Sequence, residues 1–157
     1  MKRIALTLAV LTAVCALLCA CGKAKAKAKP ISEIWSQIKN EVTFEDFSEY
    51  DDVAKLNRNY GITEDMVAEF AGGKNGSGVN QEEIVLIKAT NEENAEAVRQ
   101  SLETKFQSKL NQNKNYNAEQ AKMIEGCKVE KNGLYVTMIV SDNAEQITGI
   151  FKKGAAL

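Results

Sequence analysis

Residues 83–89 are EIVLIKA, a run that is apolar at consecutive positions through its middle. Consecutive apolar residues put apolar side chains on both faces of a β-strand, and such a strand lies inside a sheet rather than at its edge. We therefore expect residues 83–89 to form the central strand, around which the rest of the fold is built.

The preceding segment is predicted to pair with this strand as a hairpin. Residues 66–71 alternate with the two-residue period of a strand, and GGKNGSG at residues 72–78 is typical of a flexible loop. This glycine-rich loop does not fit a phosphate cradle, because Lys74 is followed by Asn75 and a strand rather than by Ser or Thr and a helix.

A second hairpin is predicted near the C-terminal end. Asn132-Gly133 lies between two strand-like runs, residues 127–131 and 134–141. Asn-Gly favours a type I′ turn, which needs a positive φ at both loop positions. The two hairpins together supply about four strands.

Apolar residues at helical spacing predict the helices. Ile31, Ile34, Trp35 and Ile38 form one stripe of a helix that follows Pro30 and ends near Asn40. Further helices are predicted over residues 52–60, capped by Asp51, and over residues 91–112, capped by Thr90 and Glu93. A short helix capped by Asn117 and Gln120 is predicted to stop at Gly126, and the last helix is predicted to be capped by Asp142 and Glu145. The sequence thus predicts an α+β fold, a small antiparallel sheet of about four strands with helices packed mainly on one face.

The N-terminal segment has the pattern of a bacterial lipoprotein signal. Lys2 and Arg3 precede an uncharged apolar core over residues 4–18, which is typical of an export signal. LCACG at residues 18–22 matches a lipobox, so we expect cleavage between Ala20 and Cys21 and a diacylglyceryl lipid on Cys21. An uncleaved membrane helix is the alternative, because residues 4–22 approach the minimum length of a span.

This signal divides the chain into a signal peptide (residues 1–20), a lipidated cysteine with its tether (21–30) and a single α+β domain (31–157). The tether alternates Lys and Ala, so it has no apolar face to bury. Fully extended, its eight residues reach at most about 30 Å from Cys21. It is either a plain spacer or a polybasic segment that binds anionic headgroups, with a binding free energy on the order of 1 kcal/mol per lysine. The four lysines of this segment are Lys23, Lys25, Lys27 and Lys29.

Composition excludes several classes of function. Six of the 20 basic residues precede Pro30, which leaves 14 basic against 21 acidic residues, and such an acidic domain is a poor nucleic-acid binder. Once Cys21 is acylated and the signal is removed, Cys127 is the one thiol left, so no intramolecular disulfide forms.

The chain has no histidine, which excludes Ser-His and Cys-His catalysis and His-ligated zinc. We therefore expect no cofactor, no metal ligands and no catalytic residues.

An acidic segment at residues 41–52 leaves one alternative open. It holds six carboxylates and no base, with three aromatic residues between them. The simpler interpretation is a segment that buries its aromatics and solvates its carboxylates. The alternative is a calcium-dependent or cation-dependent ligand binder, or a carboxylate-based enzyme, although the spacing of a calcium-binding loop is absent.

Several strings resemble a known family. They are YGI at residues 60–62, EEIVLIKA at 82–89, Val98 and GLYVTMIVSD at 133–142. Over about residues 45–152 the chain is similar to the lipoproteins of Gram-positive anaerobes known as domain of unknown function 4358. The resemblance implies a fold and a location but no site residues.

These observations favour a lipoprotein anchored to the extracytoplasmic face of the cell membrane. With an anchor, an acidic domain and no catalytic constellation, the expected function is a non-catalytic binding or interaction module rather than an enzyme. The expected partners are membrane lipid, through Cys21, and an envelope protein.

Overall fold

The computed structural model describes residues 27–157. The predicted signal peptide, Ala20, Cys21, Lys23 and Lys25 lie outside the described residues. No helix within the described range is both long and apolar enough to cross a membrane.

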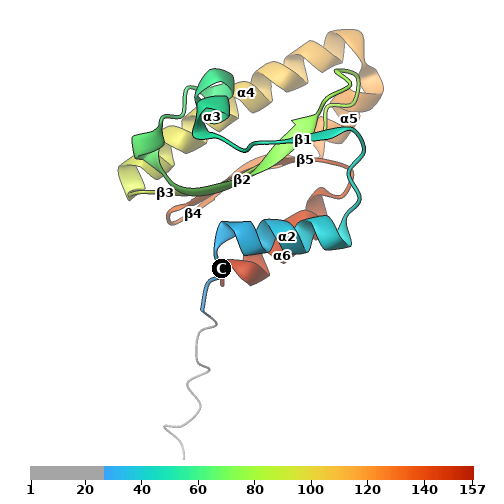
Figure 1. Ribbon diagram of the computed structural model, residues 1–157. Coiled ribbons are helices and arrows are strands. Elements are labelled where there is room, and N and C mark those ends of the chain that lie inside the picture. The colour runs from blue at the N-terminus through green and yellow to red at the C-terminus, as the bar shows by residue number, and fades with distance from the viewer. Residues whose placement is uncertain (1–26) are drawn as a thin grey trace, which may run out of the picture.

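One antiparallel sheet of five strands forms the middle of the molecule (Figure 1). Its order is β1-β2-β3-β5-β4, so residues 83–89 are the central strand, as predicted. The α+β class is confirmed, with five strands rather than about four. The strands are β1 (Phe47–Glu49), β2 (Val67–Asn75), β3 (Glu83–Ala89), β4 (Lys128–Asn132) and β5 (Tyr135–Val140).

Helices cover both faces of this sheet (Figure 1). One layer holds α2 (Ile31–Glu41) and α6 (Ala144–Gly154), and the opposite layer holds α3 (Val53–Tyr60), α4 (Glu92–Tyr116) and α5 (Ala118–Glu125). A 3-10 turn, η1 (Glu64–Met66), precedes β2. The expectation that the helices pack mainly on one face is therefore wrong.

The central strand explains why two layers are needed. Ile84 and Leu86 point into the core beneath α2 and α6, whereas Val85 and Ile87 point into the core beneath α4. All four side chains are fully buried. A strand that is apolar on both faces is stable only when both faces are covered, so the property that makes β3 central also requires the second helical layer.

The glycine pair after residue 71 belongs to a strand and not to a loop. β2 runs on to Asn75, so the predicted loop at residues 72–78 begins four residues later than expected. Gly72 has a φ of 133°, and a Cβ there would lie 2.0 Å from the carbonyl oxygen of Ile84. Glycine therefore marks the close approach of β2 and β3.

The second hairpin turns one residue later than predicted. Asn132 pairs with Tyr135, so the loop consists of Gly133 and Leu134. Within the described residues the loop has a positive φ at Gly133 alone, which matches a type II′ turn with glycine first rather than the predicted type I′ turn.

Three helices begin one residue later than predicted, because the residue after the predicted cap takes its place. Asp52 rather than Asp51 caps α3, and Asn91 rather than Thr90 caps α4. Asn143 precedes α6, without a capping bond from its side chain. Asn117 caps α5, as predicted.

Candidate functional site

A groove runs between α5 and the N-terminal end of α6. Its main hollow has a volume of about 500 Å³, and two smaller hollows of about 210 and 200 Å³ share lining residues with it. Cys127 and Glu145 belong to the main hollow and the first extension, and Met123 and Asp142 to the main hollow and the second. We call these three adjoining hollows together the α5–α6 groove.

Carboxylates dominate the rim of this groove. Five of them line the main hollow or the extension toward the β2–β3 loop: Glu45, Glu82, Glu119, Asp142 and Glu145. Lys122 is the basic residue among the lining of these two hollows, and Lys128 in the other extension is paired with Glu130 at 2.8 Å. A concave surface lined by one sign of charge concentrates the field and favours ligands of the opposite sign.

Two groove residues have raised pKa values. Burial raises the pKa of Glu82, and the charges of Asp142 and Glu45 raise it further, against a hydrogen bond from Ser141. Burial likewise raises the pKa of the Cys127 thiol, with a smaller contribution from Asp142. Both groups therefore resist ionisation, chiefly because they are buried, and the neighbouring carboxylates add to the effect.

Short hydrogen bonds hold the floor of the groove. The Ser141 hydroxyl donates to Glu82 at 2.5 Å and accepts from the backbone N–H of Asn143 at 3.1 Å. The Cys127 thiol donates to the carbonyl of Met123 at 3.2 Å. The Ser141 hydroxyl thus joins the end of β5 to the start of β3, and the Cys127 thiol, 3.6 Å from the carbonyl oxygen of Ser141, connects the end of α5 to them in one wall of the groove.

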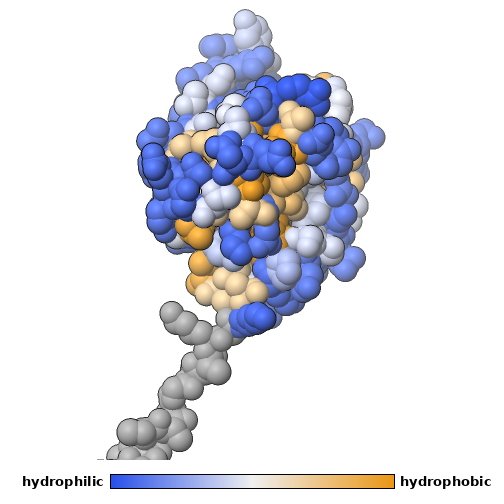
Figure 2. Space-filling model, turned by 60° about the vertical axis from the view of Figure 1, so that its left-hand side comes forward, coloured by the Kyte–Doolittle hydropathy of each residue, from blue (hydrophilic) through white to orange (hydrophobic). Residues whose placement is uncertain are grey.

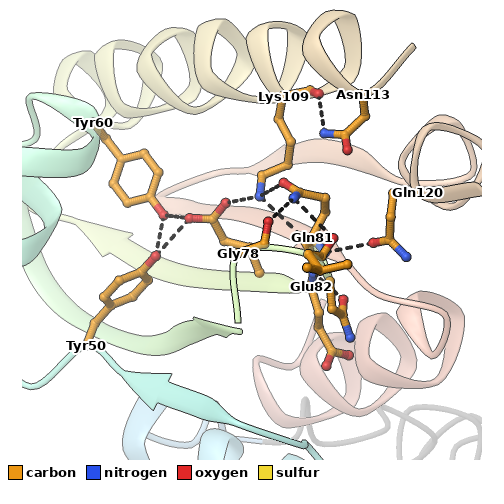
Figure 3. A network of polar contacts seen from close by, with 11 residues as sticks. Tyr50, Tyr60, Gly78, Gln81, Glu82, Lys109, Asn113 and Gln120 are labelled. Carbon is orange, nitrogen blue, oxygen red and sulfur yellow. Dashed lines mark hydrogen bonds and ion pairs between the residues drawn. The ribbon is translucent and has the colours of Figure 1, made fainter. Parts of the chain in front are cut away.

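A buried polar network lies behind this wall (Figure 3). The Glu83 carboxylate accepts hydrogen bonds from the hydroxyls of Tyr50 and Tyr60 and forms an ion pair with Lys109 at 2.9 Å. Burial alone would raise the pKa of Glu83, but the Lys109 charge and the hydrogen bonds from Tyr60, Lys109 and Tyr50 hold it below the usual range. Burial and the Glu83 charge raise the pKa values of both tyrosines.

The network also reaches the groove. Lys109 donates to the backbone carbonyl of Gln81 at 3.2 Å, and the backbone N–H of Gln81 donates to the Gln120 side chain at 2.7 Å (Figure 3). Gln120 lines the main hollow. Every buried side-chain nitrogen and oxygen in the described part has a hydrogen-bond partner, so the network positions the groove wall and is not itself an open site.

The acidic segment at residues 41–52 does not form one site. Glu49 accepts hydrogen bonds from the Trp35 indole and from Lys39, both at 2.8 Å. Asp51 pairs with Lys55, and Asp52 caps α3. Between residues 27 and 157, no group of three or more His, Cys, Asp and Glu side chains is arranged to hold a metal ion.

The described end of the tether lies far from the groove along α6. Lys27 and Lys29 are exposed, and the backbone N–H of Lys29 donates to the carbonyl of Gly154 at 2.9 Å. Gly154 is the last residue of α6, whereas the groove is lined by residues at the start of that helix.

The groove and the buried network were not predicted from the sequence. The carboxylates of the groove come from four separate segments, and no local spacing joins them. Glu83 could have been noticed in the sequence, because it is an acidic residue at the start of a strand in which every residue but Lys88 is buried. A buried acid requires a basic or hydrogen-bonding partner, although the sequence does not identify Lys109 as that partner.

The chain belongs to the family described as Domain of unknown function (DUF4358), whose family model matches residues 40–141. This match confirms the resemblance to domain of unknown function 4358 that was drawn from the strings at residues 60–62, 82–89 and 133–142. No curated protein and no solved structure matches the chain.

Proposed function

We propose that this member of the DUF4358 family is a lipoprotein of the cell membrane, anchored through diacylglyceryl-Cys21 at the extracytoplasmic face. Its folded domain is a non-catalytic interaction module that binds a basic segment of an envelope protein in the α5–α6 groove. The lipobox and the export signal support the anchor, and the form and charge of the groove support the binding role.

The observation that carries the proposal is the position of the groove relative to the tether. The tether contacts the last residue of α6, and the main hollow is lined by its first turn. A helix of 11 residues is about 16 Å long, so the two features are separated by its length. An anchored domain therefore keeps the groove open to a partner.

The chemistry of the groove selects a cationic partner. Glu119, Asp142 and Glu145 are exposed on its rim, and Glu82 lies half-buried within it. A lysine or arginine side chain entering the groove would meet these carboxylates in a partly desolvated setting, where opposite charges attract more strongly than in open water.

The anchor is tested by mass spectrometry of the protein purified from membranes. The N-terminal peptide is expected to begin at Cys21 and to carry the mass of the diacylglyceryl group. A peptide that still contains residues 1–20 without lipid would contradict the anchor.

The binding role is tested by photo-crosslinking in cells that make the lipoprotein. A photoreactive residue at Glu119, on the groove rim, is expected to crosslink to one discrete envelope protein. The matched position is Ser108, which is exposed on α4. The crosslink should be lost in the Asp142→Asn, Glu145→Gln variant and retained in Asp51→Asn. Equal crosslinking from Glu119 and Ser108 would contradict the proposal.

A further inference from the structure

An apolar hollow of about 450 Å³ lies at the turn between β4 and β5. Leu134, Tyr135 and Leu157 provide its apolar lining, and Lys88, Asn132 and Gly133 complete it. Leu157 is 52% exposed, and it is one of three large apolar side chains that the described residues leave exposed. Figure 2 shows hydrophobic residues on this side of the molecule, with a group of them at its lower end.

This hollow lies at the end of the domain from which the chain leads back to Cys21. The backbone N–H of Ile31, the first residue of α2, donates to Glu69 at 2.8 Å, and Glu69 pairs with Lys88 at 2.8 Å. The Lys88 ammonium lies 5.9 Å from the centre of the Tyr135 ring in the wall of the hollow. Lys29 is bonded to Gly154, three residues before Leu157. The apolar hollow and the described end of the tether are therefore neighbours.

Exposed lysines lie at the end of the domain that holds this hollow, whereas carboxylates dominate the α5–α6 groove. Lys27, Lys29 and Lys153 are exposed at this end of the domain. Of the carboxylates at this end, Glu69 and Glu92 are each paired with a lysine, and Glu33 and Glu93, in the first turns of α2 and α4, are exposed. An anionic surface would attract these lysines and repel the carboxylates of the groove end.

We propose that the β4–β5 turn and the C-terminal end of α6 rest on the bilayer, with Leu157 and Tyr135 among the headgroups. The inference depends on the proposed anchor at Cys21, because residues 22–29 hold this end within about 30 Å of the membrane. Leucine and tyrosine beside lysines form the mixed surface that interfacial segments use, with apolar side chains inserted and ammonium groups at headgroup level.

The bilayer fits better than a second copy of the chain. Two copies that met through this end would bring Lys27, Lys29 and Lys153 of both chains together, and like charges across an interface oppose association. The same lysines meet opposite charge on an anionic membrane. The proposed orientation also leaves the α5–α6 groove at the far end of α6, open to a partner.

The experiment uses the full lipoprotein in vesicles of phosphatidylglycerol and phosphatidylcholine in equal parts. An environment-sensitive fluorophore is attached at Leu157→Cys in a Cys127→Ser background, in which the lipidated Cys21 does not react. The matched site is Tyr116→Cys, because Tyr116 is 87% exposed at the end of α4. A nitroxide on the lipid headgroups is expected to quench the label at position 157 severalfold more than the label at position 116.

Charge variants give a second measurement that does not depend on the labelled positions alone. Lys29→Glu and Lys153→Glu, made one at a time, are each expected to reduce quenching at position 157, whereas Lys122→Glu, the same charge change in the groove, leaves it unchanged. Equal quenching at positions 157 and 116 would overturn the proposal. A label at position 157 that is shielded from water at high protein density, but is not quenched by the lipid nitroxide, would overturn it in favour of a second copy.

The outcomes for the anchor and for the orientation are separate. A protein without lipid on Cys21 contradicts the proposed function, and mass spectrometry of the N-terminal peptide reports this directly. Equal quenching in a protein whose Cys21 does carry lipid contradicts the orientation alone.

Discussion

The ammonium group of Lys109 on α4 lies 2.9 Å from a carboxylate oxygen of Glu83 at the start of β3. The Glu83 side chain is 2% exposed and that of Lys109 is 12% exposed, so the pair is removed from water. It connects the central strand to the longest helix of the described residues, and through Gln81 and Gln120 it reaches the α5–α6 groove. This one pair therefore contributes both to stability and to the shape of the candidate site.

Replacing Lys109 by Met is expected to destabilise the domain by roughly 3–5 kcal/mol, because it leaves the Glu83 charge buried without its ion-pair partner. The measurement is urea unfolding of the chain that begins at Gly22. Lys114→Met is the matched control, because Lys114 pairs with Glu125 and both side chains are about half exposed. The control is expected to cost at most about 1 kcal/mol. Equal losses in the two variants would show that burial of the Glu83 pair is unimportant.

The stability contributed by the Glu83 carboxylate is expected to disappear in acid. The pKa of Glu83 is lower in the folded protein than its ordinary value of 4.5, so the unfolded chain takes up a proton first as the pH falls. The contribution is complete above the unfolded pKa and is lost as the pH falls through the folded one. The gap in unfolding free energy between the natural protein and Glu83→Gln should therefore shrink below about pH 4.5. A gap that is constant from neutral pH to about pH 3 would contradict this assignment.

Features set by neighbouring residues were predictable from the sequence. The apolar run at residues 83–89 identified the central strand, and Asn117 was found as the cap of α5. Gly133 correctly indicated a tight turn, although pairing of Asn132 with Tyr135 moved that turn by one residue. Such signals depend on side-chain periodicity and backbone preference, which are properties of short segments.

Features set by contacts between distant segments were not predictable. β1 has three residues and exists because its partner β2 continues through Gly73, where a Cβ would lie 2.4 Å from the carbonyl of Ser48. The α5–α6 groove forms where the β2–β3 loop, α5 and the start of α6 meet, and no short pattern records that meeting.

Replacing Gly72 by Ala is expected to destabilise the domain by about 1–3 kcal/mol or more, because its φ of 133° disfavours L-residues and its Cβ would collide with Ile84. Gly149→Ala in α6 is the matched control. A Cβ at Gly149 meets nothing within 4 Å, and alanine stabilises a helix interior by up to about 1 kcal/mol relative to glycine. Thermal unfolding should therefore shift the two variants in opposite directions. A Gly72→Ala variant as stable as the natural protein would show that β2 and β3 can separate at little cost.

The Cys127 thiol is expected to react slowly with iodoacetamide near neutral pH, because burial and the neighbouring Asp142 raise its pKa and thiolate is the reactive form. Its rate should keep rising above the pH at which an exposed thiol has levelled off. The comparison thiol is Gln112→Cys in a Cys127→Ser background, exposed on α4. In urea the two thiols should react alike, because unfolding removes both causes of the shift. Asp142→Asn should lower the midpoint of the Cys127 profile without changing that of the comparison thiol. A Cys127 midpoint that is insensitive to Asp142→Asn would mean that the groove carboxylates exert no field on the thiol, and the cationic selectivity proposed for the groove would lose its electrostatic basis.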